Sequence, residues 1–237
     1  MGKQTQIMIM KTNALNKPKI IKAVIFDLDG TLLYTLEDIY LSVNYALAFF
    51  NEPTRSLDEI KHFTGNGVKV LIDKSVQIGS KNRDAIEEKY RKRYEETALD
   101  HIKKYEGIEE LLKELKKLKI KTAIETNKFQ SAVDEIYEKY FSGLIDIPLG
   151  EKPPLRRKPY PDMSMKVLEL LNLTRDEVVY VGDSETDLET ASNANLYCLS
   201  CTWGFRTREE LLNAGAYHLI DKPSEIIDFI KEINKEN

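Results

Sequence analysis

Residues 20–32 read IIKAVIFDLDGTL, and this stretch is the clearest indication of the fold class. Its first half is apolar and β-branched, and its second half carries Asp27 and Asp29 just before Gly30. A short apolar run that ends at such breakers is typical of a buried strand in a parallel sheet. Because side chains two apart on a strand point the same way, both aspartates should point to one side of the strand end. The sequence therefore puts two negative charges at the edge of its own core.

After Gly107, helical patterns alternate with strand patterns along the rest of the chain. This alternation predicts parallel βαβ units joined by right-handed crossovers, and so an α/β fold. The strand at 23–26 has no partner in the segment that follows it, so we expect it to pair with the later strands. The strands are predicted at 120–127, 144–150, 177–183, 196–201 and 216–220.

A helical segment separates the first strand from the later ones. Apolar residues recur at three- and four-residue spacing over 36–50, and two further helices are predicted over 66–78 and 83–97. No strand pattern is visible between Thr35 and Lys104. We therefore predict a tail over 1–18, a discontinuous α/β core over 19–34 and 105–237, and a helical cap over 35–104.

Composition excludes several classes of protein. The formal net charge is -4 and the pI is about 5.6, which argues against a nucleic-acid partner because no global basic field exists. No apolar stretch approaches the roughly 20 residues that span a bilayer, and no signal peptide is visible. Cys198 and Cys201 are predicted to be small core residues on opposite faces of one strand, not a redox pair. We expect a cytoplasmic protein without membrane contact.

Polar residues follow several predicted strands. In an open parallel sheet, ligands bind beyond the carboxyl ends of the strands, so we expect these residues to meet. Clustered carboxylates repel each other and need a cation, and oxygen donors with open positions suit Mg²⁺. The residues that follow the strands are Asp27, Asp29, Thr126, Asn127, Asp183 and Asp187.

Each of these residues also has an ordinary structural explanation. Thr126 and Asn127 alone would be read as a helix cap, and Asp187 could cap or pair within its helix. Lys158 alone would be a surface charge, and Lys152 competes with it as an anion-binding cation. We prefer Lys158 because two prolines stiffen its loop directly ahead of a helix.

The stretches FDLDGTL, ETN, KPYP and VGDSETD stand in this order, and together they resemble the haloacid dehalogenase superfamily of phosphatases over about residues 20–222. The resemblance implies a Rossmann-like parallel sheet with helices on both faces and an inserted all-helical cap. It also implies a hydrolase that acts on phosphoric monoesters.

The resemblance implies a role for each matching residue. Asp27 would be the nucleophile that forms an aspartyl-phosphate, and Asp29 would protonate the leaving oxygen and later activate water. Asp183 would bind Mg²⁺ with Asp27 and the Asp29 backbone carbonyl, and Asp187 would support this cluster. The expected phosphate-binding residues are Thr126, Asn127 and Lys158.

The substrate is inferred from further stretches, GNGVKVLI and CTWGFRTREELLNAGA, which resemble those of phosphoglycolate phosphatases and their relatives. Gly65, Asn66 and Gly67 would form a loop over the site, with Lys69 and Arg206 as further substrate contacts. An ordinary turn and a surface arginine are the structural alternatives. Tyr34-Thr35 stand where many relatives carry Asp-Ser or Asp-Thr.

We therefore predict a Mg²⁺-dependent phosphatase of a small anionic phosphorylated metabolite, monomeric or homodimeric, with phosphoglycolate as the leading substrate. A pyrophosphatase, a sugar-phosphate phosphatase and a phosphomutase of the same superfamily are the alternatives. A phosphate-binding regulatory module without turnover is the alternative from another class.

Overall fold

A computed structural model describes residues 17–97 and 99–235, so most of the predicted tail lies outside the described residues. A six-stranded sheet with the order β5-β4-β1-β6-β7-β8 forms the centre of the molecule. Every neighbouring pair in it is parallel, which confirms the predicted α/β fold. The strands are β1 (Ala23–Phe26), β4 (Lys121–Phe129), β5 (Ile147–Glu151), β6 (Val178–Gly182), β7 (Tyr197–Cys201) and β8 (Leu219–Ile220).

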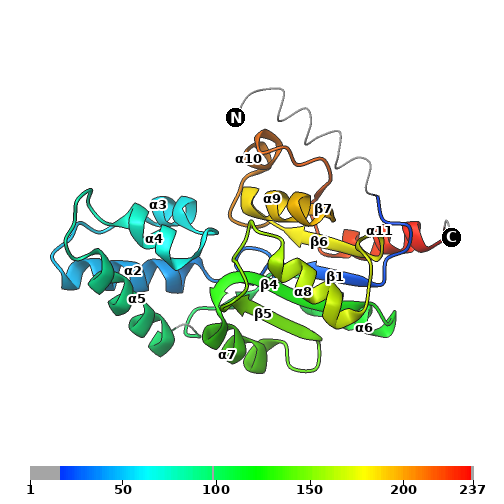
Figure 1. Cartoon of the computed structure of the whole chain (residues 1–237), viewed down its shortest axis with the longest axis horizontal. Helices are drawn as coiled ribbons and strands as arrows, with labels where there is room; N and C mark the ends of the chain where they lie inside the picture. Colours follow the sequence, from blue (N-terminus) through cyan, green and yellow to red (C-terminus); the bar gives the residue numbers. More distant parts are fainter. Residues whose placement is uncertain (1–16, 98, 236–237) are drawn as a thin grey trace.

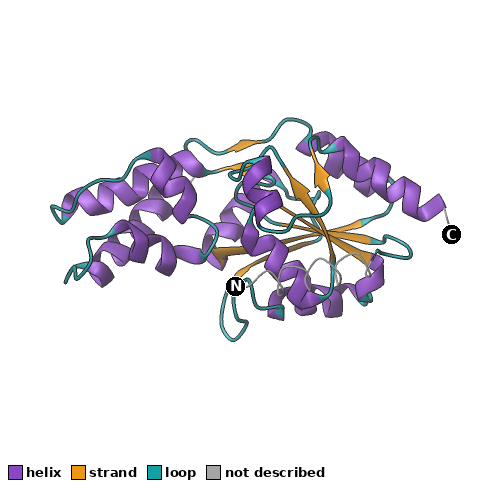
Figure 2. Cartoon of the chain, turned by 90° about the horizontal axis from the view of Figure 1, so that it is seen from above, coloured by secondary structure: helices purple, strands orange, loops and turns teal. Residues whose placement is uncertain are grey.

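Helices cover both faces of this sheet (Figure 2). On one face, Val24 and Phe26 of β1 pack in a core with α6 (Ile108–Lys117), α7 (Gln130–Tyr140) and α11 (Ser224–Lys235). On the other face, Ala23 and Ile25 pack with α8 (Asp162–Leu171), α9 (Glu185–Ala194) and α10 (Arg208–Asn213). A short 3-10 helix, η1 (Arg175–Glu177), precedes β6. Strand β1 is therefore buried on both sides, as its continuous apolar run predicts.

The two cysteines lie on opposite faces of β7. Both are free and buried, with Cys198 in the core under α8 and α9 and Cys201 in the core under α6 and α11. Burial raises the pKa of each thiol, so both are neutral core groups. The prediction that CLSC is not a redox pair agrees with this placement.

Four helices between β1 and the remaining strands form a helical insertion, which projects to one side of the sheet (Figure 1). They are α2 (Leu36–Phe49), α3 (Leu57–Phe63), α4 (Gly67–Ser75) and α5 (Arg83–Thr97), and they share an apolar core. Helix α3 was not predicted because only Ile60 in it is buried, which leaves no periodic pattern. Its start does carry a signal, the capping box of Ser56 and Glu59.

A two-stranded antiparallel ribbon joins the helical insertion to the sheet. It pairs β2 (Leu33–Tyr34) with β3 (Lys103–Lys104), so the prediction of no strand up to Lys104 is wrong. Two-residue strands are too short to show a period of two, which is why the sequence pattern missed them. The treatment of 35–104 as a separate cap domain stays a prediction.

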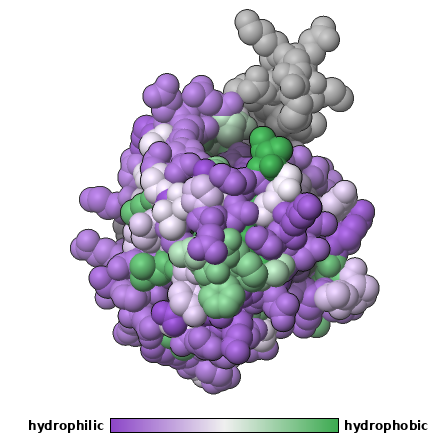
Figure 3. All heavy atoms as spheres, turned by 90° about the vertical axis from the view of Figure 1, so that its left-hand side faces the viewer, coloured by the Kyte–Doolittle hydropathy of each residue, from purple (hydrophilic) through white to green (hydrophobic). Residues whose placement is uncertain are grey.

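The outer end of the helical insertion is mostly hydrophilic, with a patch of apolar side chains near its middle (Figure 3). The exposed apolar side chains of the insertion include Leu41, Phe49 and Ile78. Within 17–97 and 99–235, no helix has the length and apolar character needed to cross a bilayer.

Candidate active site

The sheet order brings the polar strand ends together. Strand β1 lies between β4 and β6, with Phe26 in register with Ile124 on one side and with Val181 on the other. The residues just beyond these positions therefore share one edge of the sheet, where ligands bind in open parallel sheets. Asp27 follows β1, Thr126 and Asn127 lie at this end of β4, and Asp183 follows β6.

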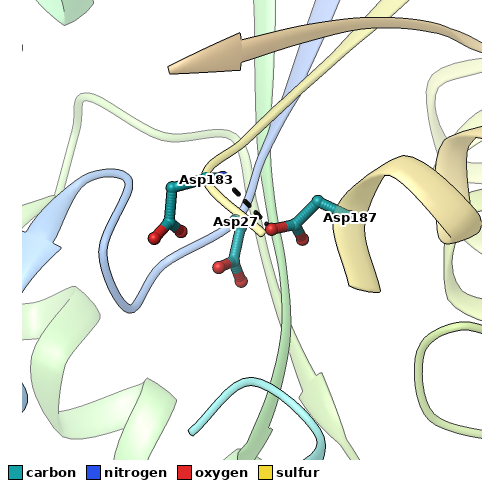
Figure 4. A group of neighbouring side chains, drawn as sticks. All are labelled: Asp27, Asp183 and Asp187. Atoms are coloured by element: carbon teal, nitrogen blue, oxygen red, sulfur yellow. Dashed lines mark hydrogen bonds between the residues drawn. The ribbon is translucent and has the colours of Figure 1, made fainter. Parts of the chain in front are cut away.

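Three carboxylates converge at this edge. Oxygens of Asp27, Asp183 and Asp187 lie within 4.8 Å of one another, and all three residues are buried (Figure 4). Burial, with the nearby Asp187 carboxylate, raises the pKa of Asp27 well above its usual range and raises that of Asp183 to about 7. Buried, mutually repelling carboxylates of this kind are stabilised in their charged form by a nearby cation. A buried set of three carboxylates fits a hard divalent cation such as Mg²⁺.

Lys158 supplies one positive charge to this group. Its Nζ donates to Asp27 Oδ1 at 2.7 Å and to Asp187 Oδ1 at 2.7 Å, and the side chain is almost fully buried. Burial alone would lower the pKa of Lys158, but Asp187 and Asp27 raise it, so the amine stays charged. Lys152 is exposed. Of the two lysines considered from the sequence, Lys158 is therefore the one at the aspartates.

Asp187 organises the turn that carries Asp183. As the first-turn acid of α9, its Oδ2 accepts from the backbone N–H groups of Asp183 at 3.2 Å and Ser184 at 3.1 Å. The Ser184 hydroxyl donates to the same oxygen at 2.6 Å, and Ser184 and Asp187 form the capping box at the start of α9. Asp187 thus acts as a helix cap and also belongs to the carboxylate cluster, whereas the sequence suggested a choice between these roles.

Asp183 fits tightly against two loops. The Thr31 hydroxyl donates to Asp183 Oδ1 at 3.1 Å, and the backbone N–H of Phe205 donates to Oδ2 at 2.6 Å. Gly30 has a φ of +91° and lies so close that a β-carbon there would overlap the Asp183 carboxylate. The glycine of FDLDGTL is therefore required both by its backbone conformation and by this approach.

Asn127 joins three segments of the site. Its Nδ2 donates to the carbonyl of Gly65 at 3.0 Å and to that of Lys158 at 3.1 Å, and its Oδ1 accepts from the Lys158 N–H at 2.8 Å. Both ends of this amide are thus occupied by the protein. The neighbouring Thr126 hydroxyl oxygen accepts from the backbone N–H of Lys128 at 3.2 Å, and its own proton has no acceptor among residues 17–97 and 99–235, so it is free for a phosphoryl oxygen.

Asp29 is held apart from the three-carboxylate cluster. The hydroxyl of Thr35 donates to its Oδ1 at 2.6 Å, and Lys128 Nζ lies 3.0 Å from the same oxygen. Both donors contact Oδ1, which leaves Oδ2 for another partner. Neither Thr35 nor Lys128 was given a role in the site from the sequence. A signal did exist for Lys128, since it directly follows Thr126 and Asn127 on β4.

The loop of the helical insertion predicted to cover the site does reach it. Gly65 and Gly67 line the cavity, with φ values of +111° and +80° that favour glycine. Asn66 Oδ1 accepts from the Thr186 hydroxyl at 3.2 Å. Lys69 is exposed and is absent from the residues that line the cavity.

Arg206 lines the cavity but is largely engaged with the protein. Its guanidinium pairs with Glu185 at 2.8 and 3.0 Å. It also donates to the carbonyls of Lys61 at 3.0 Å and Thr64 at 3.2 Å, both in the helical insertion. Arg206 therefore ties the insertion to the start of α9.

The cavity above the aspartates is small, about 50 Å³. Polar residues at the strand ends form part of its lining, and apolar side chains form a further part, its apolar wall. Tyr34, at the departure from the pattern of many relatives, packs edge-on against Tyr105 and Phe205 beside this wall. The wall consists of Ile39, Val68, Leu71, Tyr90, Phe129 and Phe205.

The chain is similar to known hydrolases. The family model of haloacid dehalogenase-like hydrolases matches residues 24–200. A phosphoglycolate phosphatase of Cereibacter sphaeroides is 36% identical over 77% of this chain and 86% of its own length. That of Colwellia psychrerythraea is 28% identical over 89% of this chain and 97% of its own length.

Solved structures give the same result. A candidate phosphoglycolate phosphatase from Lactobacillus delbrueckii subsp. bulgaricus superimposes with a TM-score of 0.84 at 31% identity, covering 89% of this chain and 98% of that one. CbbY from Rhodobacter sphaeroides, solved with xylulose-1,5-bisphosphate, gives a TM-score of 0.73 at 25% identity over 87% and 96% of the two chains.

Proposed function

The chain belongs to the family of haloacid dehalogenase-like hydrolases and acts on phosphate monoesters, and on this premise we propose how it works and on what. We propose a Mg²⁺-dependent phosphatase of a small phosphorylated metabolite, with 2-phosphoglycolate as the leading substrate. Asp27 attacks phosphorus, and the product of that step is an aspartyl-phosphate.

The contact between Lys158 and Asp27 carries this proposal. An anionic carboxylate can approach an anionic phosphate only where positive charge offsets their repulsion. Lys158 Nζ lies 2.7 Å from Asp27 Oδ1, buried and charged, so it can accompany the nucleophile and receive a phosphoryl oxygen. The free proton of the Thr126 hydroxyl provides a further donor at the same strand end.

The Asp27 and Asp183 carboxylates, together with the Asp29 backbone carbonyl inferred from the family, would hold the metal ion, and Asp187 supports them. When bound, Mg²⁺ supplies positive charge that stabilises the transferring phosphoryl group. The remaining residues orient this set, since Asp187 fixes the Asp183 turn and Thr31 fixes the Asp183 carboxylate.

Asp29 performs the proton transfers. Thr35 and Lys128 hold its Oδ1 and leave Oδ2 for another partner, and Asp29 lines the cavity. In the first step Asp29 donates a proton to the leaving oxygen while the bond from that oxygen to phosphorus breaks. In the second step it takes a proton from the water that attacks the aspartyl-phosphate and releases inorganic phosphate.

Two observations favour a small substrate such as 2-phosphoglycolate. The cavity of about 50 Å³ leaves little room beyond the phosphoryl group, and curated relatives at up to 36% identity are phosphoglycolate phosphatases. A sugar-phosphate phosphatase is the second candidate, favoured by the similarity to CbbY with its sugar bisphosphate. A sugar would need the helical insertion to move away from the sheet.

A panel of phosphate esters, assayed for release of inorganic phosphate with Mg²⁺ present, tests this proposal. The highest kcat/KM is expected for 2-phosphoglycolate, above sugar phosphates, pyrophosphate and p-nitrophenyl phosphate. Asp27→Asn should lower turnover of every ester by at least about 1000-fold. A higher kcat/KM for a sugar phosphate would reassign the substrate. Return of the phosphoryl group to a sugar without phosphate release would identify a mutase, and a panel without turnover would favour the regulatory module.

A further inference from the structure

Lys128 is a buried cation next to Asp29, the proposed acid-base residue. Its Nζ lies 3.0 Å from Asp29 Oδ1, donates to the Tyr94 hydroxyl oxygen of α5 at 2.8 Å and stands 4.5 Å from the centre of that ring. A lysine ammonium has three N–H donors, and these contacts use two. Lys128 also lines the cavity, so the third donor is available to a molecule bound there.

No other cavity-lining cation is as free to meet a substrate. Among the described residues that line the cavity, only Lys128 and Arg206 are cationic. Arg206 already donates four hydrogen bonds, to Glu185 and to the carbonyls of Lys61 and Thr64. The helical insertion contributes apolar and small residues to the lining but no charge. An anionic group on the leaving side of the substrate would therefore find its counter-charge at Lys128.

We propose that Lys128 binds a carboxylate of the leaving group, and that the substrate is a short O-phosphorylated 2-hydroxy acid. This inference rests on the proposed function and deepens it, since it assigns the residue that selects the substrate class. The leaving oxygen must come within about 3 Å of Asp29 to receive its proton. Lys128 Nζ lies 3.0 Å from Asp29 Oδ1, and the two oxygens of a carboxylate are about 2.2 Å apart, so Nζ is within roughly 8 Å of that oxygen.

The chemistry of the substrate fits this reach. In a phosphorylated 2-hydroxy acid only one carbon separates the ester oxygen from the carboxylate carbon, so its oxygens lie roughly 3 Å from the ester oxygen. Adding a hydrogen bond of about 3 Å gives a span of roughly 6 Å, which lies within that limit. The small cavity and its apolar wall favour a short leaving group over a longer polar one. A buried charge-assisted hydrogen bond is typically worth about 10- to 100-fold in binding.

The test compares a charged substrate with its uncharged counterpart. The kcat/KM values for 2-phosphoglycolate and for its amide, 2-phosphoglycolamide, are measured with Mg²⁺ for the wild type and for Lys128→Met and Lys128→Arg. The control variant is Lys92→Met, because Lys92 is an exposed lysine of α5 and its loss changes the net charge equally. Thermal unfolding reports whether each variant is folded.

We expect the wild type to prefer the carboxylate over the amide by about 10- to 100-fold. Lys128→Met should bring that ratio close to one, Lys128→Arg should retain much of it, and Lys92→Met should leave it unchanged. An equal loss for both substrates in Lys128→Met would overturn the inference and reduce Lys128 to a positioning residue for Asp29. Should Lys128→Met fail to fold, the ratio of kcat/KM for the carboxylate to that for the amide is compared in Lys128→Arg and Tyr94→Phe. A preserved preference for the carboxylate in both variants supports the inference, and its loss in both contradicts it.

The same data separate this inference from the proposed function. A wild type that hydrolyses p-nitrophenyl phosphate but shows no preference for the carboxylate would remove the role of Lys128 and keep the phosphatase. A wild type that hydrolyses no phosphate ester would remove both.

Discussion

Glu125 offers a test of the electrostatics beneath the site. It lies on β4, one residue before Thr126, and is fully buried. The Ser164 hydroxyl donates to its Oε2 at 2.7 Å, but its Oε1 has no hydrogen-bond partner among the described residues. Burial raises the pKa of Glu125 from its ordinary 4.5 to about 7, and Ser164 and Lys158 only partly oppose this. At neutral pH the folded chain therefore holds this carboxyl partly protonated.

The size of the effect follows from that pKa. Between pH 4.5 and about 7, the unfolded chain releases the Glu125 proton while the folded chain retains it. Stability therefore falls as pH rises across this range and levels off above it. The pKa of Glu125 differs by about 2.5 between the folded and the unfolded chain, and one pKa unit corresponds to about 1.36 kcal/mol. The free energy of unfolding therefore falls by about 3 kcal/mol across this pH range.

The substitution Glu125→Gln removes this titration and preserves the shape and the Ser164 contact. We expect its free energy of unfolding, relative to the wild type, to rise by about 3 kcal/mol between pH 4.5 and 7.5. For a chain of this size, that difference shifts the midpoint of thermal unfolding by about 6–12 °C. Urea unfolding of both proteins in EDTA, at several pH values, measures it, and Glu169→Gln on the exposed side of α8 controls for loss of a carboxylate. Parallel stability curves for Glu125→Gln and the wild type would refute the reasoning.

Two further outcomes are expected. Gly30→Ala should lower activity by at least about 100-fold, because its β-carbon would overlap the Asp183 carboxylate. The control is Gly79→Ala, since Gly79 has a similar positive φ but open space around it. That variant should lose only about 1–2 kcal/mol of stability and keep its activity. Comparable activity in the two variants would contradict this. Mg²⁺ should raise the unfolding temperature and restore turnover after EDTA treatment, since it offsets the repulsion within the carboxylate cluster. Asp183→Asn should lose both responses, and turnover that persists in EDTA would remove the metal from the account.

The parallel sheet was predictable because its signals are local. The apolar runs at β1, β6 and β7 end at breakers, and helical patterns separate them. The same periodicity placed Cys198 and Cys201 on opposite faces. The two-residue strands β2 and β3, and α3 with its single buried residue, show no such pattern and were missed.

The candidate site was predictable in position more than in detail. Strand ends and the sheet rule brought Asp27, Asp183 and Lys158 to one edge. Side-chain pairing depends on contacts between distant segments, which a single sequence does not display. The link from Asp29 through Lys128 to Tyr94 of α5, and the exposure of Lys69, are therefore known only from the structure.

The aspartyl-phosphate mechanism is tested most directly by trapping the phosphoryl group on Asp27. In Asp29→Asn, p-nitrophenyl phosphate should still phosphorylate the nucleophile, because its good leaving group needs little acid assistance. The water attack that follows lacks its base, so the intermediate should accumulate. Mass spectrometry of the digested protein is predicted to find one phosphoryl group on the peptide that carries Asp27, and none when Asp27→Asn is added. A phosphoryl group on another residue, or release of p-nitrophenol without any labelled peptide, would contradict the account.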